Sequence, residues 1–174
     1  VFSAEVLVPQ NASWKYTKGS APIAAQSKNA TFNDSGWPAS PAPFHYGEAG
    51  ITGGTVLADM RNNYTTIYLR KDFSVADLTA IDRLAIRARV DDAFIAWING
   101  TEVARFNVTE SEPAYNGLAE ASIEPTWVTN SLPAPSQYLA NGVNILAVQV
   151  LNQARTSSDL VFDLQLESSS DRVP

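Results

Sequence analysis

Apolar and polar residues alternate through the middle of the chain in a pattern typical of β-strands. Every second residue of 84–90 is apolar, which is the period of a half-buried strand. Residues 93–98 and 101–106 are two further runs, rich in β-branched and aromatic side chains. Asn99-Gly100 separates these runs, and a type I′ turn favours this dipeptide because both of its central residues need positive φ. We therefore predict a tight hairpin whose flanking residues face each other.

Further runs on both sides of this hairpin have the same features. They cover residues 5–9, 14–16, 64–73, 144–152 and 160–167. Stretches rich in Pro and Gly separate them, and three of these, 19–43, 44–54 and 107–135, are predicted to be loops. Short strands divided by turn signals favour an all-β sandwich over a helical or doubly wound fold.

A series of segments resembles the galactose-binding-like β-sandwich. In order, they are Trp14-Lys15-Tyr16, FNDSGW at 32–37, YLRKDF at 68–73, NGTEVAR at 99–105, NGVNILAV at 141–148 and SDLVFDL at 158–164. The chain is similar to the jelly-roll modules of secreted bacterial hydrolases and to the sugar-binding domain that precedes the barrel of family-two glycoside hydrolases. The resemblance implies an antiparallel jelly-roll β-sandwich. We expect one domain over residues 1–167, and a C-terminal tail or linker over 168–174, where Ser168-Ser169-Ser170-Asp171 has linker composition.

Composition narrows the classes of function. The net charge of −6 argues against a nucleic-acid partner, which would require a basic surface, and against anionic membranes or polyanionic sugars. No apolar run approaches the length of a membrane span. Cysteine is absent, which removes disulfides, thiolate nucleophiles and thiolate metal sites together.

Catalytic motifs are also missing, so we expect this chain not to be an enzyme. His45 is the single histidine, and a Ser-His-Asp triad would have to include it. Neither a nucleophile elbow nor an H-E-x-x-H sequence occurs. Asp91-Asp92 is the one obvious carboxylate pair, but successive strand residues point to opposite faces. We interpret these two residues as shaping the turn that follows.

Binding of a sugar is better supported, because the chain has 4 Trp, 6 Tyr and 7 Phe. Sugars stack their apolar faces on aromatic rings and exchange hydrogen bonds with polar side chains. The candidates are aromatic residues of the predicted loops together with polar neighbours, namely His45, Tyr46, Arg61, Asn62, Tyr64, Tyr115, Asn116 and Trp127. We place the site where the 44–63 and 107–135 regions approach each other. The alternative is that these aromatics plug the open ends of the sandwich. Trp97 is assigned to the core, with a platform on the sheet surface as its alternative.

The resemblance further implies a structural Ca²⁺ between the early loops and the last strand. Asp34 and Asp163 occupy the nearest equivalents of its ligands. The alternative for Asp163 is that it only receives a hydrogen bond. No other cofactor is expected.

Two functions are compatible with these observations. The first is a non-catalytic carbohydrate-binding module of a secreted or cell-surface multidomain protein, which binds a neutral polysaccharide and is covalently linked to other domains. The second is a structural or adhesive subunit of an extracellular filament, in which residues 1–8 would act as a donated strand and cause self-association. Both place the protein outside the cell.

Overall fold

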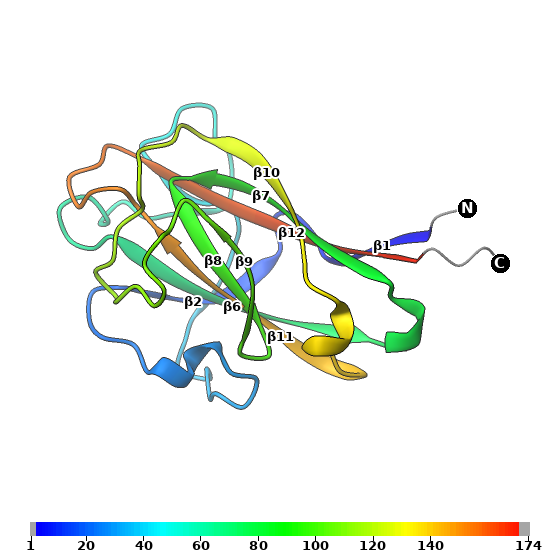
Figure 1. The fold of residues 1–174 in the computed structure, drawn as a ribbon. Helices are drawn as coiled ribbons and strands as arrows, with labels where there is room; N and C mark the ends of the chain where they lie inside the picture. Colours follow the sequence, from blue (N-terminus) through cyan, green and yellow to red (C-terminus); the bar gives the residue numbers. More distant parts are fainter. Residues whose placement is uncertain (1–2, 171–174) are drawn as a thin grey trace.

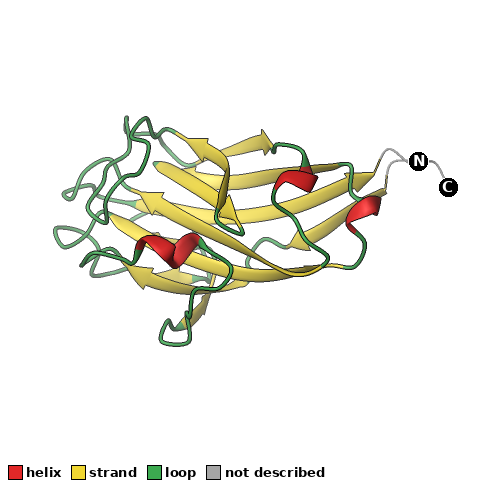
Figure 2. Ribbon diagram, turned by 60° about the horizontal axis from the view of Figure 1, so that its bottom comes forward, coloured by secondary structure: helices red, strands yellow, loops and turns green. Residues whose placement is uncertain are grey.

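A computed structural model describes residues 3–170 and shows two six-stranded sheets packed face to face (Figures 1 and 2). Sheet A comprises β1 (Ser3–Val8), β4 (Phe44–Tyr46), β5 (Thr55–Val56), β7 (Arg83–Asp91), β10 (Thr126–Ser131) and β12 (Leu160–Ser170). Sheet B comprises β2 (Ser13–Lys18), β3 (Ala39–Pro41), β6 (Thr66–Val75), β8 (Ala93–Ile98), β9 (Thr101–Phe106) and β11 (Gly142–Leu151). Three short 3₁₀ segments connect them, η1 (Ala25–Lys28), η2 (Leu78–Ala80) and η3 (Pro135–Gln137). The predicted all-β sandwich is confirmed.

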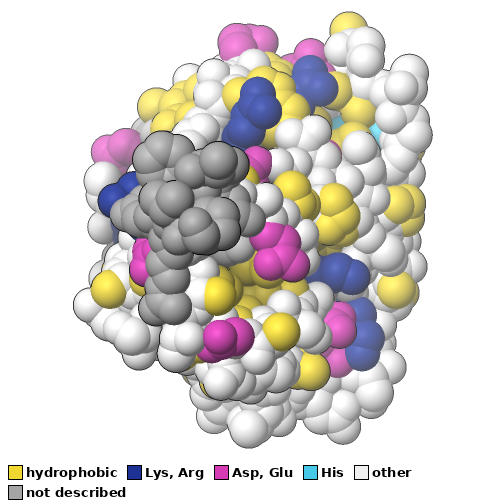
Figure 3. All heavy atoms as spheres, turned by 90° about the vertical axis from the view of Figure 1, so that its right-hand side faces the viewer, with side chains coloured by type: hydrophobic (Ala, Val, Ile, Leu, Met, Phe, Trp, Pro, Cys, Tyr) yellow, Lys and Arg dark blue, Asp and Glu magenta, His cyan; other side chains and the backbone are white. Residues whose placement is uncertain are grey.

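Strand order places distant parts of the sequence side by side. Sheet A runs β10-β7-β12-β4-β5, with β1 also paired to β12, and sheet B runs β3-β2-β6-β11-β8-β9. The pairings are antiparallel except for β4 with β5. The ends of β1 and β12 therefore lie together at one end of the molecule, where Figure 3 shows acidic and basic side chains interspersed with apolar ones. Within residues 3–170, no helix has the length and apolar character needed to cross a bilayer.

Alternation within the strands builds the core between the sheets. Phe162, Leu164 and Leu166 of β12 point inward and are buried. Strand β8, which lies next to the edge strand β9, is buried on both faces: Phe94 enters this main core, whereas Trp97 belongs to a smaller apolar cluster on the outer face of sheet B. A strand covered on both sides needs apolar residues at every position, which is why 93–98 lacks alternation.

The predicted hairpin between β8 and β9 is confirmed. Ile98 pairs with Thr101, and both turn residues have positive φ, 50° at Asn99 and 87° at Gly100. The Asn99 side chain also fixes the turn to the rest of the sheet, since its Oδ1 accepts a hydrogen bond from the Ile145 backbone N–H at 2.9 Å. The turn is therefore bonded to β11 as well as to its own two strands.

Replacing Gly100 with valine should destabilise the protein by about 1–3 kcal/mol, because a β-branched residue resists positive φ. A Cβ atom at this position would also lie 2.6 Å from Asn29 Oδ1. Chemical denaturation measures the loss. Gly36→Val is the matched control, since an added Cβ there has no atom within 4 Å and the φ of Gly36 is not positive. Equal unfolding free energies for the two variants would contradict this account of the turn.

The structure differs from the sequence prediction in the loops and at the C-terminus. β3, β4 and β5 lie in the predicted 19–43 and 44–54 loops or directly after them, and β10 lies inside the predicted 107–135 loop. β3, β5 and β10 are edge strands, which bury few side chains and leave a weak alternation in the sequence, whereas β4 is buried but only three residues long. β12 continues to Ser170, so residues 168–170 are part of the sandwich rather than a tail, while 171–174 lie outside the described residues.

The segment expected to act as a donated strand is paired within its own chain. Ser3–Val8 forms β1 and runs antiparallel to β12, with Ser3 opposite Ser170. Residues 1–2 of that segment lie outside the described part of the chain. Exchange of this strand with another copy would first require β1 to leave β12.

Candidate functional site

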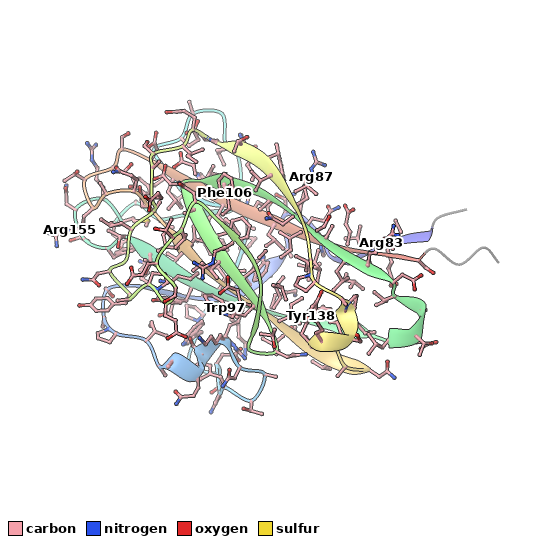
Figure 4. All side chains as sticks on the ribbon, in the orientation of Figure 1. Arg83, Arg87, Trp97, Phe106, Tyr138 and Arg155 are labelled. Carbon is pink, nitrogen blue, oxygen red and sulfur yellow. The ribbon has the colours of Figure 1, made fainter. Side chains whose placement is uncertain are left out.

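A recess of about 270 Å³ lies on the outer face of sheet B. Side chains of three adjacent strands form its floor: Tyr68 from β6, Gln149 from β11 and Trp97 from β8. The segment containing η1 forms one wall, and residues 112–115 form the other. Figure 4 shows Trp97 on the side of the sandwich that carries η1. The recess is thus built on rigid strands and closed by two long connections.

Two aromatic rings give the floor its apolar character. Trp97 is packed beside Ile95 and Ala147 of the outer apolar cluster and is 9% exposed, with Lys28 Nζ 5.5 Å from the centre of its ring. Tyr68 is half-buried, and burial raises the pKa of its hydroxyl above the ordinary value of 10. The hydroxyl therefore remains protonated at neutral pH and can donate a hydrogen bond to a ligand.

Gln149 ties the 112–115 wall to the floor. Its Nε2 donates to Tyr68 Oη at 3.1 Å, to the Ala114 carbonyl at 3.1 Å and to the Pro113 carbonyl at 3.3 Å. Thr66 adds a hydrogen bond from its hydroxyl to the Tyr115 carbonyl at 2.5 Å. An irregular segment thus has its backbone carbonyls satisfied by side chains of the strands beneath it, which fixes the wall in place.

Arg70 of β6 holds the opposite wall. Its side chain is 2% exposed, and its Nε lies 2.8 Å from Asp34 Oδ2. The remaining guanidinium nitrogens donate to the carbonyls of Ser27, Asn29 (3.0 Å) and Phe32 (3.5 Å). One buried cation therefore organises a segment that contains little regular structure.

The charge on Asp34 is stabilised by two cations. Burial alone would raise the pKa of this carboxyl, but hydrogen bonds from Arg70 and then from Lys15, which lies 2.6 Å away, outweigh burial and lower the pKa. At the rim, Lys28 and Glu112 form an ion pair at 3.0 Å that links the two walls. The cations that line the recess are therefore already paired with carboxylates.

His45 and Tyr46, two of the predicted site residues, are buried in β4. The His45 Nε2 lies 2.9 Å from the Gly53 carbonyl. The Tyr46 hydroxyl donates to the Ser157 carbonyl at 3.0 Å and accepts a hydrogen bond from Asn152 Nδ2 at 3.0 Å. Both side chains are thus engaged within the protein, which matches the alternative that these aromatics plug the end of the sandwich.

Three predicted residues lie on the segment between β5 and β6. Tyr64 is buried and its hydroxyl donates to Asp59 Oδ1 at 2.9 Å. Arg61 and Asn62 are exposed, and the backbone N–H of Asn62 donates to the Arg155 carbonyl at 2.7 Å. This segment is fixed to the 152–159 loop and does not contribute to the recess.

The structure separates the remaining predicted residues onto opposite sheets. Tyr115 lines the recess on sheet B, and the exposed Asn116 follows it. Trp127 lies in β10, an edge strand of sheet A, where it is 41% exposed and stacks on Arg87 at 4.8 Å. Figure 4 shows Arg87 and Trp97 on different sides of the sandwich. The prediction that Trp127 stands on a loop is wrong, and it shares no site with Tyr115.

The two predicted calcium ligands are also far apart in the fold. Asp34 is bound to Arg70 on the outer side of sheet B, whereas Asp163 belongs to β12 of sheet A. Both oxygens of Asp163 accept the Asn11 backbone N–H at 3.1 Å, which matches the alternative that it only receives hydrogen bonds. Burial raises the pKa of Asp163 despite these bonds. This pair does not form a common metal site.

Sequence reasoning missed most of the residues that build the recess. Tyr68 and Arg70 could have been found, because they lie two positions apart in a predicted strand and share its polar face. Trp97 was considered as a surface platform and does line the recess. Gln149 and Lys28 gave no signal, since their roles depend on which strands and loops become neighbours.

Known structures resemble this chain along nearly its whole length. A β-glucuronidase of Bacteroides uniformis matches 97% of the chain with a TM-score of 0.60 and 17% identity. One from an uncultured Clostridium sp. matches 98% with a TM-score of 0.57 and 14% identity. A glycosyl hydrolase family 2 member of Bacteroides cellulosilyticus matches 95% with a TM-score of 0.55 and 14% identity. No protein-family model matches the sequence, and neither does any curated protein.

The match covers only part of those enzymes. The chain corresponds to 18% of the Bacteroides uniformis protein, 29% of the Clostridium protein and 20% of the Bacteroides cellulosilyticus protein. At these identities the likeness concerns the fold alone. The resemblance inferred from the sequence segments is thereby confirmed: this chain has the fold of the β-sandwich portion of family 2 glycoside hydrolases.

Proposed function

We propose that this chain is a non-catalytic carbohydrate-binding module that holds a neutral glycan in the recess on sheet B. One observation carries the proposal: Trp97 and Tyr68 lie on one sheet face beside Gln149, between two walls whose polar side chains are Ser27, Lys28, Glu112 and Tyr115. Such a surface offers an apolar floor for the C–H face of a sugar and hydrogen-bonding groups for its hydroxyls. Its volume of about 270 Å³ suits a small ligand or a short stretch of a polysaccharide.

The charges around the recess favour a neutral sugar. Arg70 is paired with Asp34, and Lys28 is paired with Glu112, so neither cation is available for a uronate without breaking an existing pair. Glu112 is the one carboxylate among the residues that line the recess in the described part of the chain. Glycosidases generally need two opposed carboxylates, so this arrangement supports binding rather than hydrolysis.

The similar structures are parts of larger enzymes. Similar sandwiches form 18–29% of glycoside hydrolase chains, which supports a role beside a covalently linked catalytic domain. In this role the module would hold the catalytic domain close to its polysaccharide, which raises the effective concentration of substrate at that domain. Since such polysaccharides are found outside cells, we place the protein there as well.

Replacing Tyr68 with alanine should weaken glycan binding by about 1–3 kcal/mol, the range expected when an aromatic anchor is truncated. A glycan array would identify the neutral ligand, and isothermal titration would measure the loss. The control is Trp127→Ala, which removes an exposed aromatic ring from the opposite sheet and should leave the affinity unchanged. Circular dichroism would establish that both variants are folded.

Two outcomes would contradict the proposal. The first is a folded protein that binds no neutral polysaccharide on the array. The second is a loss of affinity in Trp127→Ala with none in Tyr68→Ala, which would move the site to sheet A. Binding of glucuronic acid in preference to neutral sugars would contradict the neutral class of ligand, but not the position of the site.

A further inference from the structure

Three carboxylates meet at one end of sheet A, on the opposite sheet from the recess. Glu48 follows β4, Asp91 ends β7 and Asp159 precedes β12. These strands are neighbours, since Leu160 pairs with Tyr46 and Val161 pairs with Asp91. One oxygen from each carboxylate lies within 4.8 Å of the others. The topology of the sheet therefore gathers three acidic residues that are more than 40 positions apart in the sequence.

Asp91 is buried there without a hydrogen-bond donor. It is 4% exposed, and within residues 3–170 its carboxylate receives no hydrogen bond and forms no ion pair. Its neighbour Asp92 differs, because the backbone N–H groups of Ile123 and Gln153 each donate to it at 2.7 Å. A buried carboxylate without donors is costly to the folded state. Hydrogen bonds within the protein therefore compensate the burial of Asp92, whereas none compensates the burial of Asp91.

The surroundings of Asp91 add to this cost. Burial, followed by repulsion from Asp92, Asp159, Glu48 and Glu124, raises the pKa of Asp91 to about 8. All of these charged neighbours are acidic. Arg61 is a cation that acts at this end of the sheet, where its charge is felt by the Tyr46 hydroxyl beside the cluster.

A second buried acceptor next to the cluster also lacks a partner. Asn152 is 1% exposed, and its Nδ2 donates to the Asp159 carbonyl and to the Tyr46 hydroxyl, each at 3.0 Å. Its Oδ1 is buried and receives no hydrogen bond from residues 3–170. These two bonds hold the amide beside Asp159. A positive ligand at this end of the sheet would meet the unpaired carboxylate of Asp91.

We propose that Glu48, Asp91 and Asp159 bind one Ca²⁺ ion. Hard divalent cations take oxygen ligands, and Ca²⁺ accepts carboxylates in irregular arrangements. Mg²⁺ instead demands near-ideal octahedral geometry and keeps several of its waters, which suits three carboxylates from separate strand ends less well. One oxygen from each carboxylate lies within 4.8 Å of the others, so all three can reach a single ion. The ion would join the loop after β4 to the ends of β7 and β12.

The experiment measures the melting temperature and calorimetric binding of the EDTA-treated protein as CaCl₂ or MgCl₂ is added. One Ca²⁺ per chain should bind, and the melting temperature should rise by about 5 °C at a hundredfold excess over Kd. Mg²⁺ should give a smaller shift. Glu48→Gln and Asp159→Asn should abolish the calcium response. The control, Asp72→Asn, removes an exposed carboxylate elsewhere and should keep the response.

A measurement in EDTA separates loss of the site from loss of the fold. Each cluster variant removes like-charge repulsion, so without calcium it should melt at the same temperature as the native protein or higher. A native protein whose melting temperature does not change with Ca²⁺ would overturn the proposal. A calcium response that survives in both cluster variants would also overturn it. Neither result concerns the glycan recess, which lies on the other sheet.

Discussion

Asp34→Ala should lower the free energy of unfolding by about 3–5 kcal/mol, the range observed when one partner of a buried ion pair is removed. Arg70 would then keep a full positive charge at 2% side-chain exposure, with only backbone carbonyls as acceptors. For a domain of this size, the melting temperature should fall by about 10 °C. Calorimetry or urea denaturation measures both quantities.

The matched control is Glu112→Ala, which breaks the ion pair to Lys28 at the rim of the same recess. The Glu112 side chain is 80% exposed, so this change should cost no more than about 1 kcal/mol. Equal costs for the two variants would mean that Arg70 finds adequate acceptors without Asp34. Glycan affinity should fall in Asp34→Ala as well, because the 27–32 wall depends on Arg70.

The pH dependence of Asp34→Ala gives an independent check. The pKa of Asp34 is lower in the folded protein than its ordinary value of 3.8, so the unfolded chain takes up a proton first as the pH falls. The stabilisation by Asp34 is therefore complete above about pH 5 and is lost as the pH drops through the folded-state pKa. The difference in unfolding free energy between the native protein and Asp34→Ala should stay constant from pH 7 to about pH 5. A difference that disappears near neutral pH would contradict the ion-pair explanation.

Local sequence patterns were sufficient for the central strands. Alternation at 84–90 and the Asn99-Gly100 turn depend on residues adjacent in sequence, and both predicted features are present. The edge strand β10 was missed, because its outward residues, including Trp127, are exposed and only one neighbouring strand covers it. Weak burial leaves a weak alternation in the sequence. Ser168–Ser170 was missed for a related reason: its pairing with β1 relies on backbone hydrogen bonds rather than on apolar side chains.

The candidate sites were harder to predict, since each depends on contacts between distant strands. Tyr115 was identified from its loop, but its partners in the recess come from β6, β8 and β11. Asp91 and Asp92 were interpreted as turn residues, but Asp92 accepts hydrogen bonds from the distant N–H groups of Ile123 and Gln153. Only the pairing of β7 with β12 and of β12 with β4 brings Asp91 to Asp159 and Glu48. A single sequence does not contain this order of strands.

The hydrogen-bond network around Asn144 provides the second large effect. Asn144 is completely buried, and its Oδ1 accepts from the Ala140 N–H at 2.9 Å and from Asn99 Nδ2 at 2.8 Å. Its own Nδ2 donates to the carbonyls of Ala140 at 2.8 Å and Gly142 at 3.0 Å. One amide therefore joins the β8–β9 turn to the segment that precedes β11.

Asn144→Ala should destabilise the protein by about 3–5 kcal/mol, because it leaves several buried polar groups without partners at about 1–3 kcal/mol each. Asn63→Ala is the control: this exposed amide donates to the Asp59 carbonyl at 2.7 Å, and water can replace it. A double-mutant cycle with Asn99→Ala should show coupling of about 1 kcal/mol or more, since either change breaks the hydrogen bond that joins the two amides. Additive effects would mean that the turn and the Ala140 segment are stabilised independently, and that the hairpin does not depend on Asn144.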